Sequence, residues 1–165
     1  MDFKVFVSYS TKDLDHVEAL RAQLANTPLK LFVAEHSVIP GEDLSSRIKS
    51  SISTCDLFVL VWSKNAKESG WVSQEIGQAS AFNKQILPLV LDEEHAPEGF
   101  VSNLKYIQAY KSISEALSEA KNILLDAYNK KSTLVLQQQQ QQQQKESNIF
   151  GFGAAALALW LLARK

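Results

Sequence analysis

The stretch that decides the fold is LFVLVW, at Leu57–Trp62, in which all six residues are apolar. A short apolar run of this kind is typical of a central strand in a parallel sheet, because helices cover such a strand on both faces. The run KVFVS at Lys4–Ser8 is β-branched and aromatic, and it predicts a buried first strand. Three further strands are expected, at Leu29–Ala34, Gln85–Leu91 and Lys105–Ala109. Pro88 cannot donate a backbone hydrogen bond, so we expect its strand to lie at a sheet edge or to contain a bulge.

Helical patterns separate these strands. Apolar residues repeat at helical spacing in four segments, at Asp13–Leu24, Asp43–Ser53, Trp71–Phe82 and Ser112–Tyr128. Strands that alternate with helices indicate an α/β fold with a mostly parallel sheet and helices on both faces. In such folds, ligands bind beyond the carboxyl ends of the strands. A functional site is therefore expected among three loops, Tyr9–Lys12, Glu35–Asp43 and Ser63–Trp71.

The composition excludes several classes of protein. The chain has 165 residues, with 17 basic and 18 acidic side chains and a formal net charge of -1. Because there is no basic excess, a nucleic-acid partner is not expected. Cys55 is the single cysteine, so an intrachain disulfide is impossible and the thiol is expected to be a buried apolar group. The segment Met1–Lys4 lacks the features of a signal peptide, so we expect the domain to be cytoplasmic.

The chain divides into an α/β domain at 1–128, a polar linker at 129–148 and an apolar tail at 149–165. The linker contains the consecutive glutamines Gln137–Gln144, which form either a solvated spacer or an extension of the last helix. The uncharged stretch Ile149–Ala163 would reach roughly 22 Å as a helix, against about 30 Å of membrane hydrocarbon. We expect this apolar helix to anchor the domain at a membrane. The alternative is a helix that packs against another protein chain.

Several common ligand-binding motifs are missing from the sequence of the loops. Ser8–Thr11 follows the first strand and contains no glycine, so it is neither a P-loop nor a GxGxxG dinucleotide fingerprint. Trp62 and Ser63 end the third predicted strand, where a phosphoacceptor receiver domain would need an aspartate. The histidines lack the spacing of a metal site, at His16, His36 and His95. Neither a metal nor a cofactor is therefore expected.

Five segments together resemble the TIR domain family in their order and spacing. They are FVSY at Phe6–Tyr9 with the following Asp13, Pro40-Gly41 with the following Leu44 and Ile48, Cys55–Ser63, SGWVSQEI at Ser69–Ile76, and ILPL at Ile86–Leu89. They are similar to the family's first strand, its BB loop and next helix, its third strand, the W-x-x-x-E motif of its third helix and its fourth strand. The resemblance covers Phe3 to Tyr128. It implies a flavodoxin-like three-layer α/β fold with a five-stranded, mostly parallel sheet.

The resemblance also implies a catalytic role for Glu75, because the glutamate of the W-x-x-x-E motif is catalytic in NAD-cleaving TIR enzymes of the prokaryotic defence type. NAD would then be a substrate of a glycohydrolase or cyclase. The nicotinamide ring of NAD is a cation and leaves as a neutral molecule, so the reaction needs little general acid catalysis. The reaction needs a carboxylate that holds the ribose hydroxyls and stabilises an oxocarbenium-like transition state. A helix glutamate considered without its motif is, however, most often a solvated surface residue.

Further residues are expected to contact the substrate or a second subunit. The expected substrate contacts are Tyr9, Ser8, Ser10, Trp71, Lys12 and Asp43. In the BB loop, which covers the site or contacts a neighbouring subunit in the family, the corresponding residues are Pro40, Gly41 and Glu42. Some relatives place arginines after the tyrosine. Here three other cations could bind the diphosphate, Lys12, Arg47 and Lys64.

Three functions fit the sequence. The first is an NAD-cleaving enzyme that produces nicotinamide with ADP-ribose, a cyclic ADP-ribose or a conjugate, for defence signalling or NAD depletion. The second is a TIR adaptor without enzymatic activity, which assembles signalling complexes at a membrane. The third is a membrane-perturbing tail triggered by the TIR domain. The expected partners are NAD, further copies of the chain through TIR–TIR contacts, a membrane through residues 149–163 and a separate effector protein.

Overall fold

The structure is a computed structural model that describes the backbone of residues 2–33 and 43–162 and the side chains of residues 2–33 and 43–145. It consists of two compact units, Met1–Asp126 and Ala127–Lys165. The three predicted BB-loop residues, Pro40, Gly41 and Glu42, lie outside the described residues.

The first unit contains a five-stranded sheet in the order β2-β1-β3-β4-β5. Its strands are β1 (Phe3–Ser8), β2 (Leu29–Val33), β3 (Leu57–Trp62), β4 (Ile86–Val90) and β5 (Ile107–Gln108). Each neighbouring pair is parallel, so the predicted α/β fold with a five-stranded, mostly parallel sheet is confirmed. All six residues of the central strand β3 are buried, as its apolar sequence requires.

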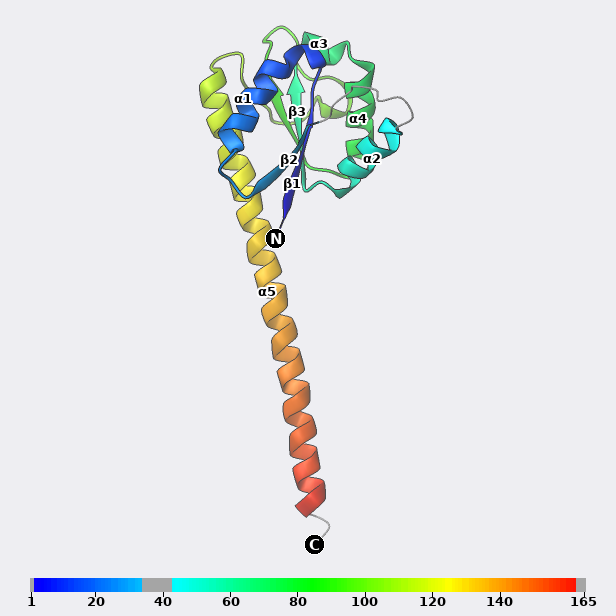
Figure 1. Ribbon diagram of the computed structural model, residues 1–165, viewed down its shortest axis with the longest axis vertical. Coiled ribbons are helices and arrows are strands. Elements are labelled where there is room, and N and C mark those ends of the chain that lie inside the picture. Colours follow the sequence, from blue (N-terminus) through cyan, green and yellow to red (C-terminus); the bar gives the residue numbers. More distant parts are fainter. Residues whose placement is uncertain (1, 34–42, 163–165) are drawn as a thin grey trace. The chain divides into compact units, whose positions relative to one another are not determined.

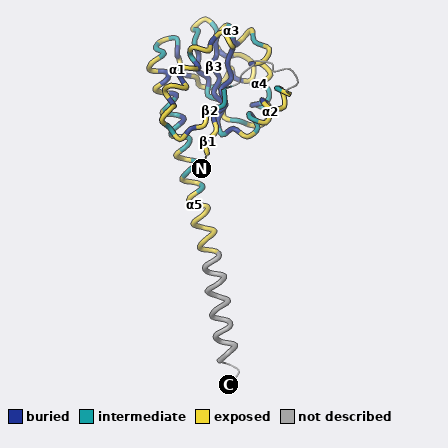
Figure 2. Tube along the Cα trace, viewed as in Figure 1, coloured by how far each residue is buried: buried dark blue, intermediate teal, exposed yellow. Residues whose placement is uncertain are grey.

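Helices cover both faces of the sheet in this unit (Figure 1). They are α1 (Leu14–Leu24), α2 (Leu44–Thr54), α3 (Lys64–Lys67), α4 (Gly70–Ala81) and α5 (Ile113–Leu162), with 3₁₀ turns η1 (Thr11–Asp13) and η2 (Gly99–Val101). Helix α1 and the first turns of α5 lie on one side of the strands, and α2 and α4 lie on the other (Figure 1). The buried residues concentrate in the strands between these two layers (Figure 2).

The layer of α2 and α4 is built on aromatic and aliphatic side chains. Phe6 of β1 stacks on both Phe32 and Phe58, with ring centroids 5.4 and 5.3 Å away. Apolar residues of α2 and α4 pack on this stack, among them Ile48, Ile52, Val72, Ile76 and Ala79. Their spacing of three and four residues forms one stripe along each helix, which fixes the face that each helix turns toward the sheet.

Pro88 lies within β4, which pairs with β3 on one side and with β5 on the other. The prediction of an edge strand is therefore wrong. The alternative prediction of a bulge is also wrong, because the pairing of β4 with β3 is continuous from Phe58↔Ile86 to Trp62↔Val90. Strand β5 pairs only with Leu89 and Val90. Since β5 does not extend to Pro88, the missing N–H there removes no ladder hydrogen bond.

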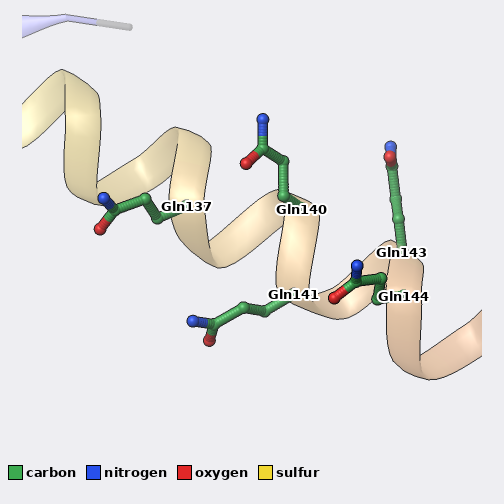
Figure 3. Close-up of a pocket in the computed structure, with 5 residues that line it drawn as sticks. All are labelled: Gln137, Gln140, Gln141, Gln143 and Gln144. Carbon is green, nitrogen blue, oxygen red and sulfur yellow. The ribbon is translucent and has the colours of Figure 1, made fainter.

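The second unit consists of the later part of α5, which continues through the glutamine tract to Leu162. Of the two alternatives for this tract, the structure contains the extended helix. The side chains of Gln137, Gln140, Gln141, Gln143 and Gln144 stand out from the helix, and the space between them is open to solvent (Figure 3). Among the described residues, no helix is both long enough and apolar enough to cross a membrane. Membrane anchoring by residues 149–163 stays a prediction.

Candidate functional site

Among the described residues of the first unit, Glu75 is the largest polar side chain that is almost fully buried, with 1% of its surface exposed. Helix α4 turns Val72, Ile76 and Ala79 toward the sheet, and Glu75 occupies a position in the same stripe. The N-cap of α4, Ser69, accepts a hydrogen bond from the backbone N–H of Val72 and fixes the first turn of the helix. The sequence therefore places a carboxylate where a helix of this kind normally has an apolar residue.

Ser8 meets this carboxylate at the carboxyl end of β1. Side chains alternate along a strand, so Ser8 lies on the same face as Phe6 and points toward the layer of α2 and α4. Ser8 is fully buried, and its Oγ donates a hydrogen bond of 2.5 Å to Oε2 of Glu75. Burial raises the pKa of Glu75 from 4.5 to about 7, while the hydrogen bond from Ser8 acts in the lowering direction.

A second cluster of polar side chains lies at the same edge of the sheet and connects two segments of the chain, the turn η1 and the start of α3. Ser63, directly after β3, donates from Oγ to Oδ2 of Asp13 over 2.5 Å, and Asn65 donates from Nδ2 to Oδ1 over 2.8 Å. The Ser63 hydroxyl also accepts from the backbone N–H of Ala66 and caps α3. Asp13 and Ser63 are both buried, with 6% and 3% exposed. The carboxyl edge of the sheet therefore holds two buried carboxyl groups, Asp13 and Glu75.

The TIR domain profile matches residues 5–125 of this chain, which include both of these groups. The chain belongs to the TIR domain family. The resemblance of the five sequence segments is thereby confirmed. No curated protein matches the chain in sequence.

Solved structures agree with this TIR fold. The TIR domain of the Toll-related receptor TRR-2 from Hydra magnipapillata is 18% identical, with a TM-score of 0.61, and the match covers 75% of this chain and 97% of that one. The Clostridium botulinum CMP N-glycosidase BcmB is 23% identical, with a TM-score of 0.53 and coverage of 72% and 98%. A prokaryotic SEFIR domain is 18% identical, with a TM-score of 0.53 and coverage of 73% and 97%. At these identities the similarity shows the fold alone.

The TIR domain brings most of the predicted substrate residues to one edge of the sheet. Ser8, Tyr9 and Ser10 follow one another at the end of β1, and all three are buried. Trp71 is 39% exposed and stands four residues before Glu75, so it lies on the same face of α4. Lys12 is exposed in η1. The structure thus places Glu75 and Ser8 in direct contact, and the other residues on the flanking segments.

Asp43 has a local structural role in the TIR domain. It is the N-cap of α2, where Oδ1 accepts a 3.0 Å hydrogen bond from the Ser46 N–H and Oδ2 accepts from the Ser46 hydroxyl. These hydrogen bonds lower the pKa of the Asp43 carboxyl. Capping satisfies a backbone donor that has no partner within the helix. Capping therefore gives Asp43 a structural role, and its predicted contact with a substrate stays a prediction.

Replacing Asp43 tests the capping role. Asp43→Ala is expected to lower the free energy of unfolding by about 1 kcal/mol, because the first turn of α2 loses its cap. Asp43→Ser keeps a capping oxygen and is expected to retain most of the stability. Urea unfolding of the two variants measures the difference. Equal losses in both variants would show that capping is not what Asp43 contributes.

Asp13, Ser63 and Asn65 were not among the predicted site residues. The sequence indicates Asp13 as part of the first-strand motif and as the start of a helix, and Ser63 as the end of the third-strand motif and the start of a loop. Ser63 carries a usable signal, since it is a polar residue directly beyond the carboxyl end of an apolar strand, whereas Asp13 lies five residues after the end of β1. The segment Ser63–Trp71 is not the predicted loop throughout, because it contains α3. In the part of the chain that the structure describes, no group of three metal-ligating side chains comes together.

Proposed function

We propose that this TIR domain cleaves the bond between nicotinamide and ribose in NAD, with Glu75 as the catalytic residue. The observation that carries the proposal is a buried carboxyl group in the position of the W-x-x-x-E glutamate, at the carboxyl edge of a parallel sheet. Burial of a carboxyl group is unfavourable for folding, so buried carboxyl groups with a raised pKa are concentrated at functional sites.

The reaction breaks the bond between the ribose C1′ and the ring nitrogen of nicotinamide. The electron pair of that bond moves to the ring nitrogen, which neutralises the pyridinium charge and leaves a positive charge on the ribose. A water oxygen then bonds to C1′ and releases a proton, giving ADP-ribose. If a nucleophile of the same or another molecule bonds instead, the product is a cyclic ADP-ribose or a conjugate.

Glu75 would act on the positive charge that develops on the ribose. A carboxylate in a poorly solvated site stabilises a nearby cation much more than it does in water. The same burial that raises the pKa of Glu75 to about 7 therefore strengthens its effect once it is ionised. The hydrogen bond from Ser8 holds Oε2 in place and leaves the carboxylate oriented before the substrate arrives.

Substrate entry requires a rearrangement at this edge, since only 1% of Glu75 is exposed. We assign this step to self-association through TIR–TIR contacts, so that an isolated copy has low activity. A membrane contact of residues 149–163 would raise the local concentration of the domains and favour such assembly. The product would then act in defence signalling, through NAD depletion or a separate effector protein.

A structural relative gives context for this chemistry. BcmB is described as a CMP N-glycosidase, so its reaction also breaks a bond between a ribose and a nitrogen. Its likeness to this chain extends to the fold only. A protein of this fold can therefore carry out N-glycosidic cleavage, and the site in the present chain is argued from its own residues.

The test is incubation of the purified full chain with NAD, over a range of protein concentrations, followed by chromatography of the products. The proposal predicts stoichiometric nicotinamide, an ADP-ribose product and a rate per molecule that rises with protein concentration. If NAD stays intact at every concentration, including on lipid vesicles, the enzyme is excluded. A TIR adaptor would then be supported by self-association without NAD loss, and a membrane-perturbing tail by dye leakage from the vesicles.

A further inference from the structure

The buried polar residues of the first unit belong to one connected group. Where the structure describes burial, the polar or charged residues that are buried are Ser8, Ser10, Asp13, Ser63 and Glu75. Burying a polar group is unfavourable unless it is hydrogen-bonded, so such groups are normally few and dispersed. Here all five lie at the carboxyl edge of the sheet, on two segments of the chain, 8–13 and 63–75.

Hydrogen bonds connect these two segments at both ends. At one end, Ser8 donates to Glu75. At the other end, the Ser63 hydroxyl donates a hydrogen bond to the Asp13 carboxylate. The backbone N–H of Asp13 donates a hydrogen bond of 2.8 Å to the Ser10 carbonyl, which closes the turn within segment 8–13. Segment 8–13 therefore contacts the α3–α4 region twice, once at the start of α3 and once at Glu75.

A continuous series of hydrogen bonds runs from Asp13 to the first turn of α4. The Ser63 hydroxyl accepts from the Ala66 N–H over 3.0 Å, and the Ala66 carbonyl accepts from the Ser69 N–H over 3.1 Å. Ser69 then caps α4 by accepting from the Val72 N–H. Only Glu68 and Ser69 separate the two helices, so a displacement of α3 must also displace the start of α4.

We propose that Asp13 is a positioning residue for Glu75. It holds Ser63 and α3 against the end of β1, and α3 holds the first turn of α4, so that the Glu75 carboxylate stays in contact with Ser8. Asp92 supports the same segment by accepting from the Lys64 N–H over 2.6 Å, but Asp13 connects it to the strand that carries Ser8. The consequence for catalysis rests on the proposed function, whereas the consequence for the geometry of Glu75 does not.

The test measures the ionisation of Glu75 by NMR in the full chain labelled with carbon-13 glutamate, with the signal identified by its absence in Glu75→Gln. In Asp13→Asn and Ser63→Ala, α4 shifts and water reaches the carboxyl group. The midpoint of its titration is then expected to fall by about one pH unit or more, from about 7 toward 4.5. Ser63→Thr keeps the hydroxyl and is expected to titrate as the wild type does.

Two controls separate positioning from a loss of stability. Asp56→Asn removes a carboxylate that accepts from the Lys4 N–H over 2.9 Å at the opposite edge of the sheet, and it should leave the Glu75 midpoint unchanged. Ser8→Ala removes the pKa-lowering hydrogen bond and should move the midpoint upward, opposite to Asp13→Asn. A folded Asp13→Asn or Ser63→Ala variant with the wild-type midpoint would overturn the proposal.

Kinetics then separate this inference from the proposed function. If the wild type cleaves NAD, Asp13→Asn and Ser63→Ala are expected to lower kcat about tenfold with little change in KM, since misplacement acts on the transition state. If the wild type does not cleave NAD, the proposed function fails, and the NMR titration still decides whether Asp13 positions Glu75.

Discussion

Glu75→Gln is expected to release nicotinamide from NAD about 100- to 1,000-fold more slowly than the wild type. This corresponds to a loss of about 3–4 kcal/mol of transition-state stabilisation, the range found when one preorganised electrostatic group is removed. Glutamine has nearly the same shape and can accept the Ser8 hydrogen bond, but it carries no charge for the developing cation. The measurement is the initial rate of nicotinamide release at pH 8, where Glu75 is ionised in the wild type.

Glu68→Gln is the matched control, because it makes the same chemical change on an exposed side chain between α3 and α4. It should retain the wild-type rate. Equal rates in the wild type and Glu75→Gln would show that position 75 does not act on the reaction. Equal losses in both glutamine variants would point to a general electrostatic effect of this region.

The second large effect concerns stability and pH. The pKa of Glu75 is raised from 4.5 to about 7 in the folded chain. Between these values the folded state keeps a proton that the unfolded state has lost, so the free energy of unfolding falls as the pH rises through this window. A difference of about 2.5 pH units at about 1.4 kcal/mol each gives a total of about 3 kcal/mol. The loss is absent below pH 4.5 and complete above about 7.

Glu75→Gln cannot ionise and should not show this loss. Relative to the wild type, its free energy of unfolding is therefore expected to increase by about 3 kcal/mol between pH 4.5 and pH 8. Urea unfolding of both proteins at several pH values, monitored by tryptophan fluorescence, measures this difference in the free energy of unfolding. The pH dependence that comes from ionisable groups present in both proteins cancels in the difference. A constant difference across this range would mean that Glu75 is solvated in the folded chain.

Much of the fold could be predicted from the sequence, because a parallel α/β sheet has strong local signals. Leu57–Trp62 is apolar throughout, and the structure buries all of it at the centre of the sheet. The helices α2 and α4 begin within one residue of the predicted positions, since Asp43 and Ser69 provide N-caps directly before an apolar stripe. In these segments the local preference and the global packing agree.

Other features depend on contacts between distant segments. Helix α3 has only four residues, too few for a periodic pattern, and it is stabilised by Ser63 and by the distant Asp92. The tolerance of β4 for Pro88 depends on how far β5 extends, which the sequence of β4 does not contain. The contact of Asp13 with Ser63 joins residues 50 positions apart, so no spacing rule could predict it.

The candidate site was predictable in part. Glu75 could be selected through its motif, and its contact with Ser8 follows from strand alternation and helix periodicity once both elements are placed. Its burial, and therefore its raised pKa, follows from its position within the stripe of Val72, Ile76 and Ala79. The proposed positioning role of Asp13 rests on its hydrogen bonds with Ser63 and Asn65, which are seen only in the structure.

The most direct test of the central claim is the pH dependence of nicotinamide release by the assembled full chain, with the Glu75→Gln protein measured in parallel. In the proposed mechanism the carboxylate form is active, and the pKa of about 7 belongs to the substrate-free chain. The wild-type kcat/KM, which reports the free enzyme, is therefore expected to rise through a midpoint near 7 and to level off above it. The Glu75→Gln rate is expected to stay low and flat over the same range. A wild-type profile without this midpoint, or the same profile in the variant, would contradict the assignment of Glu75 as the group that acts on the ribose.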